Sequence, residues 1–122
     1  MKTSLYKWIG LVLSLTLLAA QGLAAEYKIL KPEKLKVMLA NKDFFLLDVH
    51  IPEQIHISGT DAFIDFRKIK QNRHLLPASK EAKIVVYCRG GGMSRAAFRD
   101  LNELGYTNVF DLQGGMRAYY RF

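Results

Sequence analysis

Two kinds of hydrophobic pattern alternate along the chain from residue 27 onward. Short, mostly apolar runs are typical of strands buried in a sheet, and they lie at residues 27–30, 44–49, 62–64, 84–87 and 108–112. Between them, apolar side chains recur at helical spacing, and helices are expected from Pro32, around residues 67–72, from Ser94 and from Met116. Alternation with short connections favours parallel strands covered by helices. The sequence therefore predicts an α/β fold, a small parallel sheet with helices on both faces.

The first part of the chain carries a different pattern. Two lysines precede an apolar stretch at residues 8–20, which small residues then follow. This order is typical of a secretory signal, and the apolar stretch is short for a membrane span, although an uncleaved anchor is the alternative. We expect a signal peptide at residues 1–25, cleaved after Ala24 or Ala25, and a single domain at residues 26–122. The expected location is a bacterial periplasm, without stable membrane association after cleavage.

The formal net charge of +7 is spread along the chain rather than gathered in one cluster. Its densest stretch, residues 67–73, interleaves cations with apolar residues, which we interpret as a solvated helix face. No nucleic-acid-binding module accompanies it, so the sequence argues against a nucleic-acid partner. A modest positive field can nevertheless draw small anions toward a site.

Cys88 is the only cysteine, so the chain cannot form an internal disulfide. It follows the strand at residues 84–87 and precedes three consecutive glycines, residues 90–92, and then a predicted helix. Backbone amides in such a loop and the helix dipole both favour a negative charge. The thiolate, which is the nucleophilic form of cysteine, is favoured in that field. A small buried hydrophobe beside a tight turn is the alternative, but the glycine run and Arg89 favour a reactive cysteine.

Five segments in order resemble a single-domain rhodanese, which is a sulfurtransferase. They are LLDVH at residues 46–50, HISGT at 56–60, VYCRGG at 86–91, LGYTNV at 104–109 and LQGGM at 112–116. The resemblance implies that Cys88 takes a sulfane sulfur from a donor such as thiosulfate, holds it as a persulfide, and passes it to cyanide or a thiol. It implies small sulfur-containing anions or thiols as partners, with a possible protein sulfur acceptor. It implies no cofactor. The residues implied to cradle the persulfide are Arg89, Gly90, Gly91, Gly92, Met93 and Ser94.

The chain departs from the rhodanese pattern in its charged residues. Many rhodanese loops carry an arginine at the fifth or sixth position when the cysteine is counted as the first. This chain has Gly92 and Met93 at those positions. We therefore expect weak capture of thiosulfate. Two supporting residues are predicted: Arg95, on the first helical turn, and Asp48, which the resemblance places near the loop with a structural salt bridge as its expected role.

The remaining candidates are assigned to packing. His50, His56 and His74 lack the spacing of a metal site, so no metal is expected and the three are assigned to packing or the surface. The pair Gly114-Gly115 is expected to let the last helix pack close to the Cys88 loop.

Two other functions are possible for a cysteine loop of this kind. The first is a cysteine phosphatase, which needs an arginine six residues after the nucleophile to clamp the phosphate. Ser94 stands at that position, so the sequence argues against a phosphatase. A non-catalytic sulfur carrier or partner-binding module on the same fold stays open as the alternative, because fold does not fix function.

Overall fold

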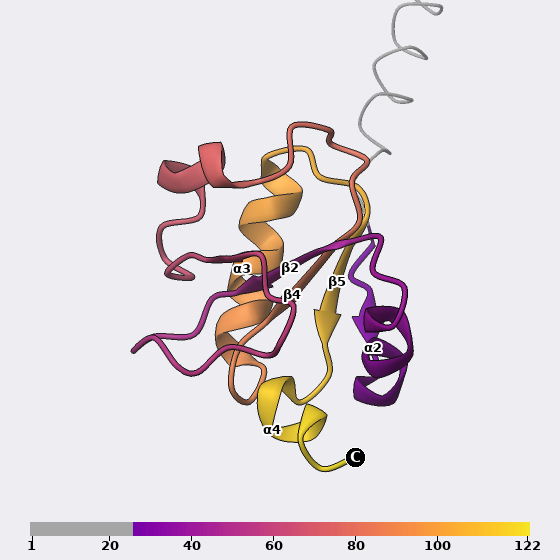
Figure 1. The fold of residues 1–122 in the computed structure, drawn as a ribbon. Helices are drawn as coiled ribbons and strands as arrows, with labels where there is room; N and C mark the ends of the chain where they lie inside the picture. The colour runs from indigo at the N-terminus through magenta and orange to yellow at the C-terminus, as the bar shows by residue number, and fades with distance from the viewer. Residues whose placement is uncertain (1–25) are drawn as a thin grey trace, which may run out of the picture.

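Every strand pair in the sheet is parallel, in a computed structural model that describes residues 26–122. The predicted signal peptide lies outside the described residues. The sheet has the order β1-β5-β4-β2-β3 (Figure 1), and its strands are β1 (Ile29–Leu30), β2 (Phe45–Asp48), β3 (Ala62–Phe63), β4 (Ile84–Tyr87) and β5 (Val109–Leu112). The helices are α2 (Pro32–Leu39), the 3-10 helix η1 (Lys70–Leu75), α3 (Gly92–Glu103) and α4 (Gly115–Tyr119). The predicted α/β class is confirmed.

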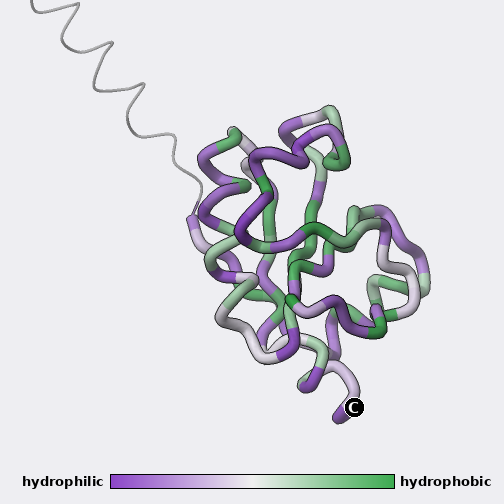
Figure 2. Tube along the Cα trace, turned by 90° about the vertical axis from the view of Figure 1, so that its left-hand side faces the viewer, coloured by the Kyte–Doolittle hydropathy of each residue, from purple (hydrophilic) through white to green (hydrophobic). Residues whose placement is uncertain are grey.

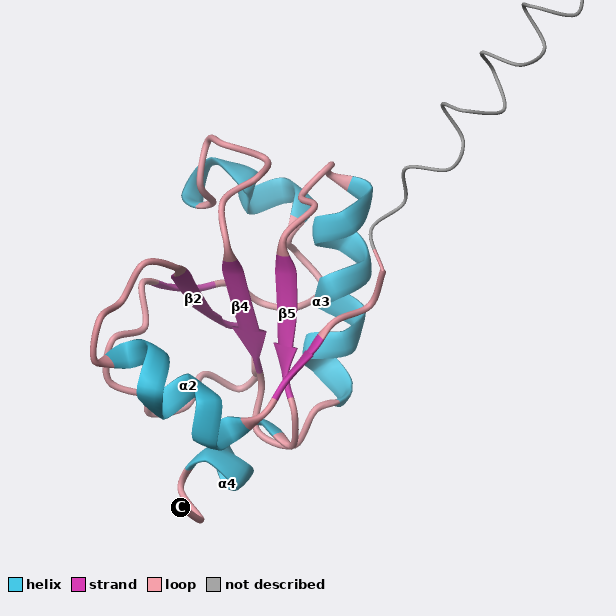
Figure 3. Cartoon of the chain, turned by 90° about the vertical axis from the view of Figure 1, so that its right-hand side faces the viewer, coloured by secondary structure: helices cyan, strands magenta, loops and turns pink. Residues whose placement is uncertain are grey.

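The two faces of the sheet are covered by different helices (Figures 1 and 3). On one face, Val86 and its neighbours pack with Ala97, Phe98 and Leu101 of α3. On the other face, Val85 and its neighbours pack with Leu35 of α2 and with residues of α4. Successive residues of β4 serve opposite faces because side chains alternate along a strand. Helices on both faces therefore explain why the strand sequences are continuously apolar. In Figure 2 the hydrophobic stretches lie along the central strands, and hydrophilic stretches form many of the outer turns.

Three helices begin at other residues than the sequence predicts, and the smallest difference is in α4, which begins at Gly115 rather than Met116. The short helix expected around residues 67–72 is a 3-10 helix that begins at Lys70. The Asp65 carboxylate accepts the backbone N–H of Arg67 at 2.9 Å and also binds its guanidinium, which holds that segment in a turn. Helix α3 begins at Gly92 rather than Ser94, because the Gly91 carbonyl already accepts the N–H of Arg95.

The register of the central strands brings three chain segments to one edge of the sheet. Asp48 at the end of β2 pairs with Tyr87 at the end of β4, and β5 runs parallel beside β4. The residues that follow these strands therefore meet beyond their carboxyl ends, where open α/β sheets bind ligands. Among the residues that the structure describes, no helix is long and apolar enough to cross a membrane.

Candidate active site

The Cys88 thiol lies at the bottom of the loop that joins β4 to α3. The residue is only 2% exposed. Its Sγ accepts the backbone N–H of Gly91 at 2.9 Å. The thiol donates to Ser94 Oγ at 3.5 Å, and the Ser94 hydroxyl in turn donates to the Gly91 carbonyl at 3.0 Å. The sulfur thus sits among hydrogen-bonding groups at the amino end of a twelve-residue helix, an arrangement that favours negative charge.

The glycines of this loop leave the space above the sulfur open. A Cβ added at Gly90, Gly91 or Gly92 would meet no atom within 4 Å. Gly91 has a φ of +126°, a backbone conformation that residues with a Cβ rarely adopt. Gly90 and Gly92, in contrast, have no positive φ. Above the loop lies a cavity of about 290 Å³, lined by His50, Cys88, Arg89, Gly90, Gly91, Gly92, Met93 and Arg117.

Asp48 is fully buried and joins the end of β2 to the segment that follows it. Its carboxylate accepts the backbone N–H of His50 at 3.0 Å and the side-chain amide of Gln54 at 3.2–3.3 Å. It also forms a salt bridge with His56 Nδ1 at 2.8 Å, and a structural salt bridge is the role expected for Asp48. The hydrogen bond to Asp48 raises the pKa of His56 above its ordinary value. His56 is partly exposed and its ring centroid lies 5.8 Å from that of Phe63, in keeping with its assignment to packing or the surface, and it is in addition the ionic partner of Asp48.

Gln54 extends this network to the cysteine loop. The Gln54 side chain is 8% exposed, and its Oε1 accepts the Nε of Arg89 at 3.2 Å. A continuous chain of contacts thus runs from Asp48 through Gln54 to the guanidinium that borders the cavity. Sequence reasoning missed Gln54, since a lone glutamine in a connecting segment carries no recognisable signal.

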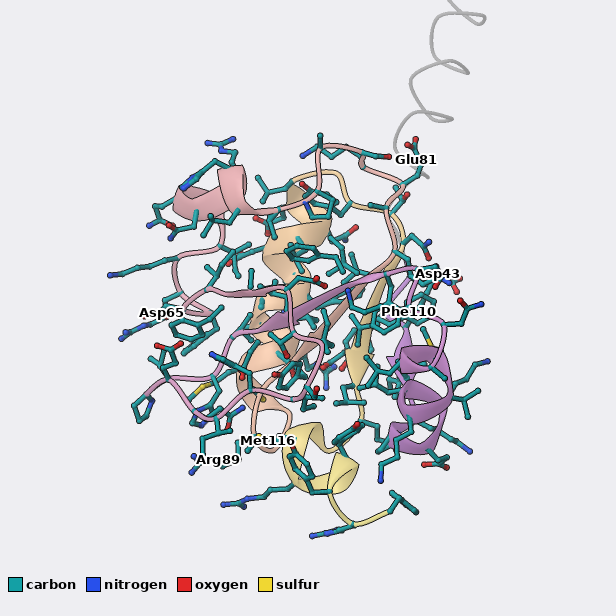
Figure 4. The ribbon with its side chains drawn as sticks, in the orientation of Figure 1. Asp43, Asp65, Glu81, Arg89, Phe110 and Met116 are labelled. Atoms are coloured by element: carbon teal, nitrogen blue, oxygen red, sulfur yellow. The ribbon has the colours of Figure 1, made fainter. Side chains whose placement is uncertain are left out.

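Helix α4 is bonded directly to the cysteine loop through its backbone. Met116 donates its N–H to the Cys88 carbonyl at 2.9 Å, and Arg117 donates to the Arg89 carbonyl at 3.1 Å. Figure 4 shows Arg89 and Met116 next to one another at this end of the molecule. A Cβ on Gly115 would lie 2.5 Å from the Cys88 carbonyl oxygen, so only glycine allows this approach. The predicted role of Gly114-Gly115 in close packing of the last helix is confirmed.

Two cavity residues were not expected to belong to the site. Arg117 reaches the cavity from α4, and His50 reaches it from the end of β2. No local motif marks Arg117, and the sequence favours packing or the surface for His50. Both are brought to Cys88 by the parallel pairing of the strands that precede them.

Arg95, one of the predicted supporting residues, is not brought to the cavity. Its guanidinium lies over the Tyr27 ring, 5.1 Å from the ring centroid. The Tyr27 hydroxyl bonds the buried Asp111, and burial raises the pKa of that carboxyl. Arg95 thus turns away from the sulfur because the helix places it on another face from Ser94. Within residues 26–122 no group of three or more histidine, cysteine or acidic residues is placed to hold a metal ion.

Comparison with known proteins shows the family of the domain. The rhodanese-like domain profile matches residues 31–121. The tRNA uridine(34) hydroxylase of Aster yellows witches'-broom phytoplasma (strain AYWB) is 30% identical over 99 residues, which is 74% of this chain and 31% of that protein. An adenylyltransferase and sulfurtransferase of Ogataea parapolymorpha is 32% identical over 101 residues, 79% of this chain and 26% of that protein. The chain thus spans about a third or less of these curated relatives.

Solved structures show the same fold. The solution structure of a rhodanese-like domain from Anabaena sp. matches with a TM-score of 0.69 at 23% identity, over 79% of this chain and 75% of that one. The crystal structure of a rhodanese-like domain protein from Staphylococcus aureus matches with a TM-score of 0.66 at 24% identity, over 75% and 90% of the two chains. Because the domain profile covers nearly all of the described residues, this chain belongs to the rhodanese-like domain family.

Proposed function

We propose that this protein is a sulfurtransferase that carries sulfane sulfur on Cys88. The observation that carries the proposal is the position of Sγ, which lies at the bottom of an open cavity with the Gly91 amide directed at it. Membership of the rhodanese-like family supports the proposal, as does the similarity to a relative whose name includes sulfurtransferase. We further propose that the protein acts after export, on small sulfur anions and on low-molecular-weight or protein thiols.

In the first half-reaction the Cys88 thiolate attacks the outer sulfur of thiosulfate. A new S–S bond forms to Cys88, the S–S bond of the donor breaks, and sulfite leaves with the electron pair of that bond. The product is a Cys88 persulfide whose terminal sulfur carries a negative charge. The Gly91 amide and the amino end of α3 stabilise negative charge at this place throughout.

In the second half-reaction a nucleophilic acceptor attacks the terminal sulfur of the persulfide. The bond between the two persulfide sulfurs breaks, and Cys88 leaves as the thiolate, ready for another cycle. Cyanide would become thiocyanate, and a thiolate would become a persulfide. The two steps balance without an external oxidant or reductant, so the chain's own thiol is sufficient for the transfer.

Intact mass spectrometry tests the proposal. After incubation with thiosulfate, the protein should gain one sulfur atom and then lose it to cyanide, with release of thiocyanate. The Cys88→Ser variant should fold and show no gain. A stable gain that neither cyanide nor a thiol removes would identify a sulfur carrier instead of an enzyme. No gain from thiosulfate or from a polysulfide would contradict sulfur transfer altogether.

A further inference from the structure

We propose that Arg117 supplies a positive charge in place of the arginine missing at loop positions 92 and 93 and, with Arg89, selects an anionic sulfur donor. The identity of the ligand as a sulfur donor rests on the function proposed above. The electrostatic part of the proposal stands on the geometry of the cavity. It assigns a specificity role to a residue of α4, which no motif around Cys88 includes.

The backbone fixes Arg117 next to the loop. The Arg117 N–H donates to the Arg89 carbonyl at 3.1 Å, and the preceding residue is bonded to the Cys88 carbonyl in the same way. Gly115 allows this contact because a Cβ there would overlap the Cys88 and Arg89 carbonyl oxygens, at 2.5 and 2.7 Å. These backbone hydrogen bonds hold the start of α4 against the loop, and Arg117 is one of the residues that line the cavity.

In the part of the chain that the structure describes, no carboxylate pairs with either of the two arginines, Arg89 and Arg117. Arg89 instead bonds the neutral amide of Gln54 at 3.2 Å, which orients the guanidinium and leaves its charge intact. The nearby carboxylate of Asp48 is already paired with His56. The cavity therefore keeps two uncompensated positive charges from two separate elements.

The positive charges of Arg89 and Arg117 act mainly on the binding of the sulfur donor. Thiosulfate is a dianion, and it must come close to a thiolate, so electrostatic repulsion opposes the encounter. Two guanidinium groups offset this repulsion, and their planar donor groups suit an oxyanion. The persulfide formed afterwards carries a single charge that a backbone amide already faces. Removal of Arg117 should therefore weaken donor capture more than transfer from the loaded cysteine.

Alkylation of Cys88 measures this field without any sulfur chemistry. Iodoacetate is an anion and iodoacetamide is its neutral analogue, so the ratio of their rate constants reports the charge around the thiol. At low ionic strength, Arg117→Ala should lower this ratio by roughly three- to tenfold, the effect of one partly solvated charge at the same cavity as the thiol. Arg117→Lys should restore most of the ratio. Arg121→Ala removes the same charge from the exposed chain beyond α4, outside the cavity lining, and should leave the ratio within about twofold of wild type. Circular dichroism checks that all three variants fold.

The result that overturns the inference is an unchanged ratio in Arg117→Ala, or an equal fall in Arg121→Ala, which would indicate only the general field of a basic protein. Steady-state kinetics separate this inference from the proposed function. Arg117→Ala should raise the KM for thiosulfate with little change in transfer from a pre-formed persulfide. Sulfur transfer with an unchanged KM would overturn the inference and leave the function standing. A lowered alkylation ratio in a protein that accepts no sulfur would keep the anion-selective cavity and reject the sulfurtransferase.

Discussion

Replacement of Gly115 by alanine should separate α4 from the cysteine loop. Gly115 has a φ of +61°, and a Cβ would lie 2.5 Å from the Cys88 carbonyl oxygen, 2.7 Å from the Arg89 carbonyl oxygen and 2.8 Å from the Arg89 carbonyl carbon. All three are backbone atoms, so no side chain can rotate to make room. The overlap is relieved only if α4 moves away from the loop.

The magnitude follows from two contributions. A left-handed conformation costs a residue with a Cβ about 1–2 kcal/mol. Displacement of α4 also breaks the hydrogen bonds from Met116 and Arg117 to the loop carbonyls, each of which contributes about 0.5–1.5 kcal/mol. Together the change should lower the free energy of unfolding by roughly 2–5 kcal/mol, which is a large share of the roughly 5–15 kcal/mol typical of a small domain. In a domain of this size, the Tm should fall by about 10–30 °C.

Thermal unfolding followed by circular dichroism measures the change, and Gly90→Ala is the matched control. Gly90 also borders the cavity, but its φ is ordinary and a Cβ there meets no atom within 4 Å. Its replacement should shift stability by no more than about 0.5 kcal/mol. If Gly115→Ala unfolds within two or three degrees of the Gly90→Ala variant, on the order of 0.5 kcal/mol apart, then close approach does not pin α4 to the loop.

Three further predictions concern the site. Gly91→Val should reduce sulfur loading, measured by intact mass, more than it reduces stability, because its φ of +126° is strained for valine although the space around it is open; equal losses would assign the glycine to the turn alone. Gln54→Leu should raise the KM for thiosulfate, because the Arg89 guanidinium loses the hydrogen bond that orients it. An unchanged KM would show that this hydrogen bond does not contribute to thiosulfate binding. Asp48 raises the pKa of His56, so the stability that the pair contributes should be fully present below about pH 6.5 and lost as the pH rises through the folded pKa. His56→Asn should flatten the dependence of Tm on pH between 5 and 9, a range about the ordinary pKa of histidine, and an identical profile in the variant would contradict this coupling.

The order of elements and the place of Cys88 at the end of a central strand were predictable from the sequence. Continuous apolar runs identify strands buried on both faces, and helical spacing identifies the elements between them. Both patterns are local, because a few neighbouring residues are enough to show which side chains are buried and how the backbone repeats. The glycine run after Cys88 is local in the same sense, so a loop with one left-handed glycine facing the thiol was predictable.

The other groups at the site were decided by the tertiary structure. Gln54, His50 and Arg117 lie in three segments with no shared motif, and Arg95, close to Cys88 in sequence, turns away toward Tyr27. The parallel register of β2, β4 and β5 sets which of these segments meet, and the close contact at Gly115 sets how near α4 comes. Hydrophobic patterning specifies which faces are buried, but it carries no information on which polar side chains converge beyond the strand ends. That convergence depends on strand order and register, which arise only when the whole sheet assembles.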